Sequence, residues 1–320
     1  MALDMRWGAV THVGCVRKLN QDATLAGPTL FVVADGMGGH AAGEVASALA
    51  IAHLAEIGGP GPLHKSDIVE ALRSLNADIR RQAEIFEDKA GMGTTVVGLA
   101  VVDDHGAERL CAFNVGDSRA YRLHHGILKQ VSVDHSLVGE LVLAGNISKE
   151  EAKSHPSRNV VTRALGADDG VDPDLWVIEP VAGDRFLLCS DGLTNEVDDE
   201  AIATALGALA DPQAVVDQLL AAALSNGARD NVSVVIIEVV GVNDAHANVD
   251  EDTNPHGYRP PDSSNGVGTE IGAPAQTTAL ISSVPLAPSP GAVEGQGDEA
   301  ATLITGLPSG FPRDFEADDI

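Results

Sequence analysis

The order of strand-like and helical segments along the chain restricts its fold more than any other feature. Eight short apolar runs rich in β-branched and aromatic residues predict strands, at residues 6–12, 29–34, 94–102, 110–115, 120–123, 175–178, 185–189 and 232–240. Helical periodicity comes in pairs, at 41–57 and 66–88, where Ser66 is the expected N-cap, and again at 199–209 and 212–225. Because single helices do not alternate with single strands, a wound parallel sheet is disfavoured and a mainly antiparallel α+β architecture is expected.

Composition divides the 320 residues into two parts near Gly241. Residues 242–320 contain nine of the 16 prolines, 13 acidic side chains and only two arginines, without sustained periodicity. Such a segment buries too little apolar surface to offset its conformational entropy, so we expect a disordered acidic tail. The folded domain is then expected at 1–241. Its excursion at 136–165 is long enough to carry a function, and one or two short helices are expected within it.

The formal net charge of −27 bears on possible partners. Such acidity disfavours nucleic acid and anionic lipid and favours divalent cations, although solubility alone accounts for most exposed charges. The first residues lack a signal-peptide pattern, and no window approaches the roughly 18 apolar residues of a membrane span. Three cysteines, at 15, 111 and 189, are too few for a disulfide framework. We therefore expect a cytoplasmic protein without membrane insertion.

Aspartates recur at the ends of the apolar runs. FVVADG ends in Asp35 and Gly36, FLLCSDG contains Asp191, and CAFNVGD ends in Asp117, whereas in ARDNVSVV the residue Asp230 precedes its strand. A single Asp-Gly pair is more often a turn. The end of one antiparallel strand lies beside the start of its neighbour, so we expect these four carboxylates to share a single edge.

Carboxylates crowded within a few ångströms raise one another's pKa, and bound cations relieve the repulsion. No Cys or His stands at metal-ligand spacing, so the oxygen-only set predicts hard ions, Mg²⁺ or Mn²⁺. Gly36 would let a backbone carbonyl approach such an ion. The stretch GCVRKLNQDA adds Asp22, which could support the ions through water, and Arg17, whose guanidinium matches a phosphate. Taken alone, Arg17 would be interpreted as an ordinary surface arginine in a weak salt bridge.

Eight blocks together resemble, in order and spacing, the bacterial metal-dependent protein serine/threonine phosphatases of the PP2C (PPM) type. They are VRKLNQD, ADGMGGHAAGE, GMGTTVV, NVGDSRAY, DHSLV, VVTRALG, LLCSDGLTNEV and ARDNVSVV. The resemblance covers nearly all of residues 1–240 and none of the tail. It implies a β-sandwich of two antiparallel sheets flanked by helix pairs, with a two-metal centre at one end.

The resemblance also implies the metal ligands. Asp35 is expected to bridge both metals and Gly36 to contribute a carbonyl to one of them. Asp191 and Asp230 are expected to ligate the other metal, and Asp22 to hold a coordinated water.

Further roles follow from the same resemblance. Asp117 is expected to help hold a third, weaker metal, Arg17 to bind the phosphate, and Asn231 and Gln21 to support the site. Two positions depart from the pattern, since animal members have His where this chain has Met37, and others have Glu where it has Gln21. The first departure removes the general acid proposed for the animal enzymes.

The implied reaction is direct hydrolysis of phosphoserine or phosphothreonine in proteins by a water activated between two Mn²⁺ or Mg²⁺ ions. We expect a monomer that opposes a bacterial Ser/Thr kinase, and a flap at 138–163 that governs substrate choice. Two other classes of protein stay open. A pseudophosphatase usually lacks metal carboxylates, and none is missing here. A Ca²⁺-binding protein of the EF-hand type would need a ligand spacing that is absent.

Overall fold

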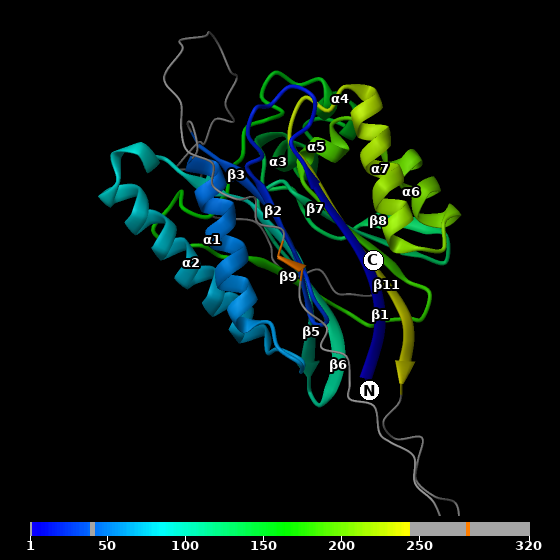
Figure 1. Ribbon diagram of the computed structural model, residues 1–320. Helices are drawn as coiled ribbons and strands as arrows, with labels where there is room; N and C mark the ends of the chain where they lie inside the picture. Colours follow the sequence, from blue (N-terminus) through cyan, green and yellow to red (C-terminus); the bar gives the residue numbers. More distant parts are fainter. Residues whose placement is uncertain (1, 39–41, 244–279, 282–320) are drawn as a thin grey trace, which may run out of the picture.

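The computed structural model describes residues 2–38, 42–243 and 280–281. It contains two antiparallel sheets, each covered on its outer face by helices (Figure 1). One sheet has the strand order β1-β11-β10-β7-β8, and the other has the order β12-β2-β3-β5-β6-β9, with β4 paired to β3. The expected α+β sandwich flanked by helix pairs is confirmed.

The strands of the described residues have the following bounds: β1 (Ala2–His12), β2 (Asp22–Ala26), β3 (Leu30–Met37), β4 (Gly93–Thr94), β5 (Val96–Asp104), β6 (Ala107–Val115), β7 (Arg119–His124), β8 (Ile127–Gln130), β9 (Asp174–Ile178), β10 (Arg185–Cys189), β11 (Val232–Asn243) and β12 (Leu280–Ile281). The helices are α1 (Ala42–Ile57), α2 (Lys65–Ile85), α3 (Leu137–Leu143), α4 (Lys149–Lys153), α5 (Asp191–Thr194), α6 (Asp199–Ala208) and α7 (Pro212–Asn226), with a 3₁₀ turn at Glu87–Lys89.

The alternation of side chains along β3 explains how two apolar cores form on either side of one sheet. Phe31 and Val33 face the second sheet, where they meet residues such as Phe186 and Ile237. Val32 points the other way, into the core beneath the helices. Because successive residues of a strand point to opposite faces, a continuous apolar run such as FVVA predicts burial on both faces.

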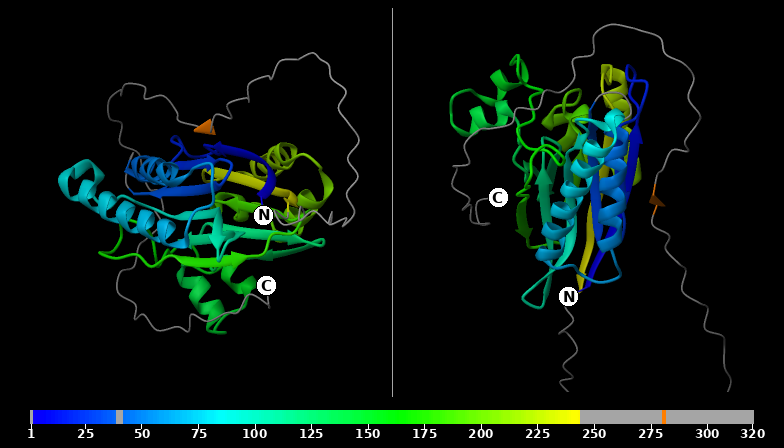
Figure 2. Two further views of the ribbon diagram at one scale, coloured as in Figure 1. Left: turned by 90° about the horizontal axis from the view of Figure 1, so that it is seen from below. Right: turned by 90° about the vertical axis from the view of Figure 1, so that its left-hand side faces the viewer.

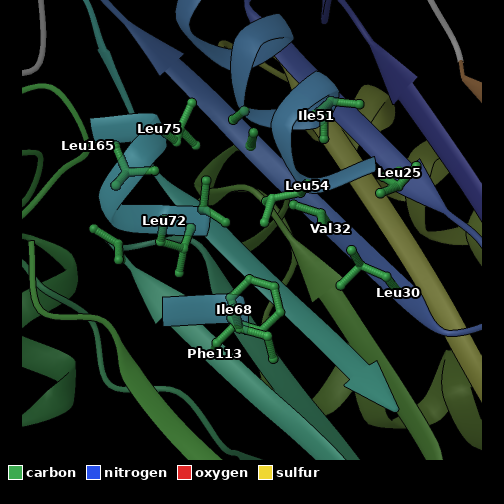
Figure 3. Close-up of a cluster of buried hydrophobic side chains, with 14 of the residues drawn as sticks. Leu25, Leu30, Val32, Ile51, Leu54, Ile68, Leu72, Leu75, Phe113 and Leu165 are labelled. Atoms are coloured by element: carbon green, nitrogen blue, oxygen red, sulfur yellow. The ribbon is translucent and has the colours of Figure 1, made fainter. Parts of the chain in front are cut away.

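The helix pairs close the two outer faces. On α2, Ile68, Leu72, Leu75 and Ile79 recur at helical spacing and are fully buried. Figure 3 shows three of them among the side chains of α1 and of the sheet that contains β3. Helices α6 and α7 cover the other sheet, on the opposite side of the molecule from α1 and α2 (Figure 2).

Several boundaries differ from the sequence-based expectation. Helix α2 begins at Lys65 and not after Ser66, because the His64 N–H donates to the Asp67 carboxylate at 2.9 Å and closes the first turn earlier. Strands β2 and β8 and the short helix α5 were not expected, since each is short and carries no clear period.

The expected boundary at Gly241 falls inside β11, whose pairing with β1 continues to Asn243. The tail expected at 242–320 lies outside the described residues, except for 242–243 at the end of β11 and for β12, which pairs with Leu25 and Ala26 of β2. Residue 41, the expected start of the first helix, also lies outside them. The excursion contains two short helices, α3 and α4, as expected. In the described part of the chain, no helix has both the length and the apolar character needed to cross a membrane.

Candidate metal centre

The first two carboxylates of the site come from one sheet. Asp22 opens β2 and lies directly opposite Asp35 of β3 in the antiparallel register. Asp22 is buried, and its Oδ2 accepts a hydrogen bond from Ser190 Oγ at 2.8 Å. Its Oδ1 is also buried and has no hydrogen-bond partner among the described residues. An unpartnered buried carboxylate oxygen is costly in free energy, so this atom calls for a ligand.

The next two carboxylates come from the other sheet. Asp191 follows β10 as the first residue of α5, and Asp230 precedes β11, the neighbour of β10. Asp117 lies in the turn between β6 of one sheet and β7 of the other. The expectation of a single shared sheet edge is therefore wrong. The carboxylates come from both sheets and lie at one end of the sandwich, because the two sheets pack face to face with these strand ends on the same side.

The aspartates interact electrostatically across that end of the sandwich. Burial, reinforced by Asp22, Asp191, Asp230 and Asp117, holds the pKa of Asp35 well above its ordinary value. Burial also raises the pKa of Asp22 to about 7, although hydrogen bonds from Ser233 and Ser190 oppose the shift.

The pKa values of Asp117 and Asp191 are raised by the same two causes, burial and neighbouring carboxylates. Burial raises the pKa of Asp117 to about 8, with a smaller contribution from Asp191. Burial and the Asp230 charge raise the pKa of Asp191 to about 6. Burial is the largest cause in all four groups and neighbouring carboxylates add to it, so a bound cation would lower these pKa values.

Gly36 lies where the backbone of β3 meets the start of α1. A Cβ on Gly36 would stand 2.0 Å from the Gly43 carbonyl oxygen, and its N–H donates to the Gln21 carbonyl at 3.1 Å. Close backbone approach therefore requires glycine here, a packing reason that the sequence did not reveal.

Arg17 contacts the site through Asp230. Its Nε and Nη2 donate to the two carboxylate oxygens of Asp230 at 3.0 Å each. The guanidinium thus lies at the carboxylates, as the phosphate-binding role requires, but in the structure it pairs with one of the expected metal ligands. Such a bidentate fork is the geometry with which arginine also grips a phosphate.

Asn231 anchors the loop that carries Arg17. Its Oδ1 accepts from the Gln21 N–H at 2.8 Å, and its Nδ2 donates to the carbonyls of Val13 and Leu19 at 2.9 Å each. Asn231 is 4% exposed. The expected supporting position is thus a bridge between β11 and the loop at 13–21.

Comparison with known proteins decides the family. Residues 16–228, more than half of the chain, match the family model for protein phosphatase 2C. The chain belongs to the protein phosphatase 2C family. Similarity to individual members of this family is also high.

This PP2C chain is 43% identical over 244 residues to the serine/threonine protein phosphatase PstP of Mycobacterium tuberculosis, an alignment that covers 75% of the chain and 46% of PstP. It thus spans about half the length of that curated relative. The serine/threonine phosphatase stp of Listeria monocytogenes is 38% identical over 215 residues, which are 65% of the chain and 84% of stp. A crystal structure of the catalytic domain of PstP in complex with two manganese ions superposes with a TM-score of 0.67 at 41% identity, covering 74% of the chain and 99% of that domain.

The donor set of this PP2C chain fits a divalent metal in its chemistry. It offers carboxylate oxygens, one of them buried without a hydrogen-bond partner among the described residues, in a cluster whose pKa values are raised by burial and by neighbouring carboxylates. Within residues 2–38 and 42–243, no three Asp, Glu, His or Cys side chains are gathered tightly enough to form a ready-made metal site. One of the expected ligands, Asp230, is paired with Arg17 at 3.0 Å.

Several residues that shape the site were not predicted. Ser190 links Asp22 to β11, since its Oγ also accepts from the Ser233 N–H at 3.0 Å. Thr95 holds the Asp35 backbone, because the Thr95 N–H donates to the Asp35 carbonyl at 2.8 Å. The Thr95 hydroxyl contacts Ser118 Oγ at 2.8 Å. The only sequence signal was their place next to the aspartates or inside the family blocks.

Proposed function

We propose that this chain is a protein serine/threonine phosphatase that hydrolyses phosphoserine and phosphothreonine esters at a two-metal centre. The observation that carries the proposal is the convergence of Asp22, Asp35, Asp117, Asp191 and Asp230 at one end of the sandwich, with raised pKa values for four of them. The names of the PstP and stp relatives support the substrate class.

Within this proposal, Asp35, Asp191, Asp230 and the Gly36 carbonyl hold two divalent ions, Mn²⁺ or Mg²⁺. When bound, such ions polarise the phosphoryl group and lower the pKa of a water toward neutrality. Asp22 holds and orients water through Oδ1, which has no hydrogen-bond partner in the described part of the chain.

The positive charge of Arg17 lies beside the carboxylates and is available to a phosphoryl group whose negative charge grows in the transition state. The Gln21 backbone N–H donates to Asn231 and thereby holds the loop that carries Arg17 and leads to Asp22 in place. Asp117 holds a third, weaker ion.

The segment 138–163, which includes α3 and α4, acts in this proposal as a flap that selects substrates without contributing to the chemistry. Exposed Leu143 offers apolar surface on that flap. The chain acts as a monomer in the cytoplasm, where its three free cysteines stay reduced, and reverses the action of a Ser/Thr protein kinase.

Metal removal and replacement test the proposal. Hydrolysis of p-nitrophenyl phosphate and of a phosphothreonine peptide should disappear after chelation and return with Mn²⁺ but not with Ca²⁺. Asp191→Asn should lower both activities by more than about 100-fold, since even outer-shell partners of metals are worth 10–100-fold. Asp217→Asn, on the exposed face of α7, is the matched control and should leave both activities unchanged.

The circular dichroism spectrum of each variant shows whether the fold persists. Full activity of the chelated wild-type chain, or of folded Asp191→Asn, would refute the two-metal proposal. Phosphopeptide binding without turnover in the presence of Mn²⁺ would favour the pseudophosphatase.

A further inference from the structure

A polar cluster around His135 lies beside the carboxylates without belonging to them. His135 precedes α3 and is 6% exposed. It contacts the Gly116 backbone on one side and the side chains of Asp174 and Arg163 on the other. Gly116 immediately precedes Asp117, so the cluster touches the turn that presents this carboxylate.

His135 and Gly116 are joined by a reciprocal pair of hydrogen bonds. The Gly116 N–H donates to His135 Nδ1 at 3.0 Å, and the His135 N–H donates to the Gly116 carbonyl at 2.9 Å. Asn114 Nδ2 donates to that same carbonyl at 2.9 Å. Both polar groups of the Gly116 backbone are therefore bonded to His135, and the carbonyl is also bonded to Asn114 at the end of β6.

The contact at Nδ1 assigns the tautomer of the ring. A nitrogen that accepts a hydrogen bond carries no proton, so the ring proton lies on Nε2. Nε2 stands 3.2 Å from Asp174 Oδ2, to which it donates. Arg163 Nη1 also lies 3.0 Å from Nε2, but two donors do not bond to each other, so in this tautomer its hydrogen bond goes to Asp174 Oδ1 at 2.8 Å. Asp174 thus keeps the imidazole in the form whose Nδ1 can accept from Gly116.

The turn that receives this contact has little freedom. Gly116 has a φ of +123°, and a Cβ there would lie 2.5 Å from Thr95 Cβ. Ser118, on the far side of Asp117, contacts the Thr95 hydroxyl at 2.8 Å. Asp117 is therefore held between an anchor at His135 and an anchor at Thr95, and the second of these also bonds to the Asp35 backbone.

We propose that His135 is a positioning residue that aims Asp117 at the third metal ion by accepting the Gly116 N–H. The proposal rests on the proposed function, because it assigns a partner to one ligand of that metal centre. His135 also holds the segment 136–165, because the Thr162 N–H donates to the His135 carbonyl at 2.8 Å.

Two amide substitutions of His135 test whether Gly116 needs the hydrogen-bond acceptor or only a side chain of similar size. His135→Asn places an amide oxygen near the position of Nδ1 and keeps the acceptor for Gly116. His135→Gln reaches the position of Nε2 and loses that acceptor. Mn²⁺ binding to the full chain is counted by electron paramagnetic resonance, which reports free Mn²⁺ without relying on activity.

His135→Gln is expected to weaken the weakest Mn²⁺ site by about tenfold or more, as outer-shell partners of metals do, and His135→Asn by clearly less. Asp117→Asn should remove that site. The double variant His135→Gln/Asp117→Asn should bind Mn²⁺ no more weakly than Asp117→Asn alone, because the two residues act through one ligand. His124→Gln is the matched control, since His124 contacts Asp184 at the far end of β7, and it should bind Mn²⁺ like the wild type.

Equal Mn²⁺ binding by wild type and His135→Gln would overturn the proposal, as would equal losses in His135→Asn and His135→Gln. Wild-type binding by Asp117→Asn would overturn it too, while leaving the two-metal function intact if Asp191→Asn still loses tight Mn²⁺ and turnover. If thermal melts show that His135→Gln is unfolded, Asp174→Asn replaces it, because loss of the partner of Nε2 should also weaken the third site.

Discussion

Asp22 and Asp35 lie directly opposite each other on the paired strands β2 and β3, with Asp22 buried. Burial raises the pKa of Asp22 to about 7 from an unfolded value near 3.8. A raised folded pKa means that the folded state holds the proton more tightly. The resulting stability is fully present below the unfolded pKa and is lost as pH rises toward 7.

We therefore expect the contribution of Asp22 to lower the melting temperature of the chelated protein progressively between pH 4 and about pH 7. Asp22→Asn should flatten that dependence, whereas exposed Asp217→Asn should not. Thermal melts in a chelator measure both effects. Adding Mn²⁺ at pH 7 should restore stability, because the ions offset the carboxylate repulsion. A chelated protein equally stable across this range would contradict the raised pKa of Asp22.

Gly36→Ala should damage the site severely. The new Cβ would lie 2.0 Å from the Gly43 carbonyl, so β3 and α1 would have to separate. We expect urea unfolding to show a loss of stability of at least about 1–3 kcal/mol, the size typical of overpacked cores. Gly59→Ala is the control, because no atom lies within 4 Å of the added Cβ. Similar stabilities for the two variants would show that the contact is easily relieved.

Arg17→Lys should lower kcat/KM for a phosphopeptide by roughly 10–100-fold, the equivalent of one charged hydrogen bond, because lysine lacks the planar fork. Folding should persist, since the Arg17 side chain is about one third exposed. Steady-state kinetics measure the effect, and Lys18→Ala, at the exposed neighbouring position, is the control. Unchanged kinetics in Arg17→Lys would assign Arg17 to the ion pair with Asp230 alone.

Asn231→Ala should cost roughly 2–3 kcal/mol in urea unfolding, because buried backbone groups of the loop at 13–21 lose their partners. Exposed Asn226→Ala, which removes one bond to the Glu196 carbonyl, should cost less than about 1 kcal/mol. Equal costs at the two positions would mean that other contacts hold the loop.

Truncation after Asn243 should leave hydrolysis of p-nitrophenyl phosphate intact, because the paired part of β11 is kept. A stop after Gly241 removes the pairs that Val242 and Asn243 make with β1 and should lower the melting temperature by a few degrees at most. Loss of activity in the longer truncation would place part of the catalytic unit beyond residue 243.

Local pattern was enough for much of this fold. The apolar runs that became β3, β5 and β11 give strands of 8, 9 and 12 residues, and the spacing of buried residues on α2 matches a helix. Short elements were missed, since β2 and β8 carry too few residues for a period to be visible. The N-cap of α2 was misplaced because a bond from the His64 N–H to Asp67 competes with the propensity of Ser66.

The sequence by itself determined which residue types are available at the site: aspartates at the ends of apolar runs, with glycines and an arginine nearby. Only the tertiary structure decided that Asp22 and Asp35 meet Asp191 and Asp230 between two sheets, and that Arg17 contacts Asp230. The physical reason is that strand identity depends on local side-chain pattern, whereas the facing of one sheet upon another depends on contacts between residues far apart in the chain.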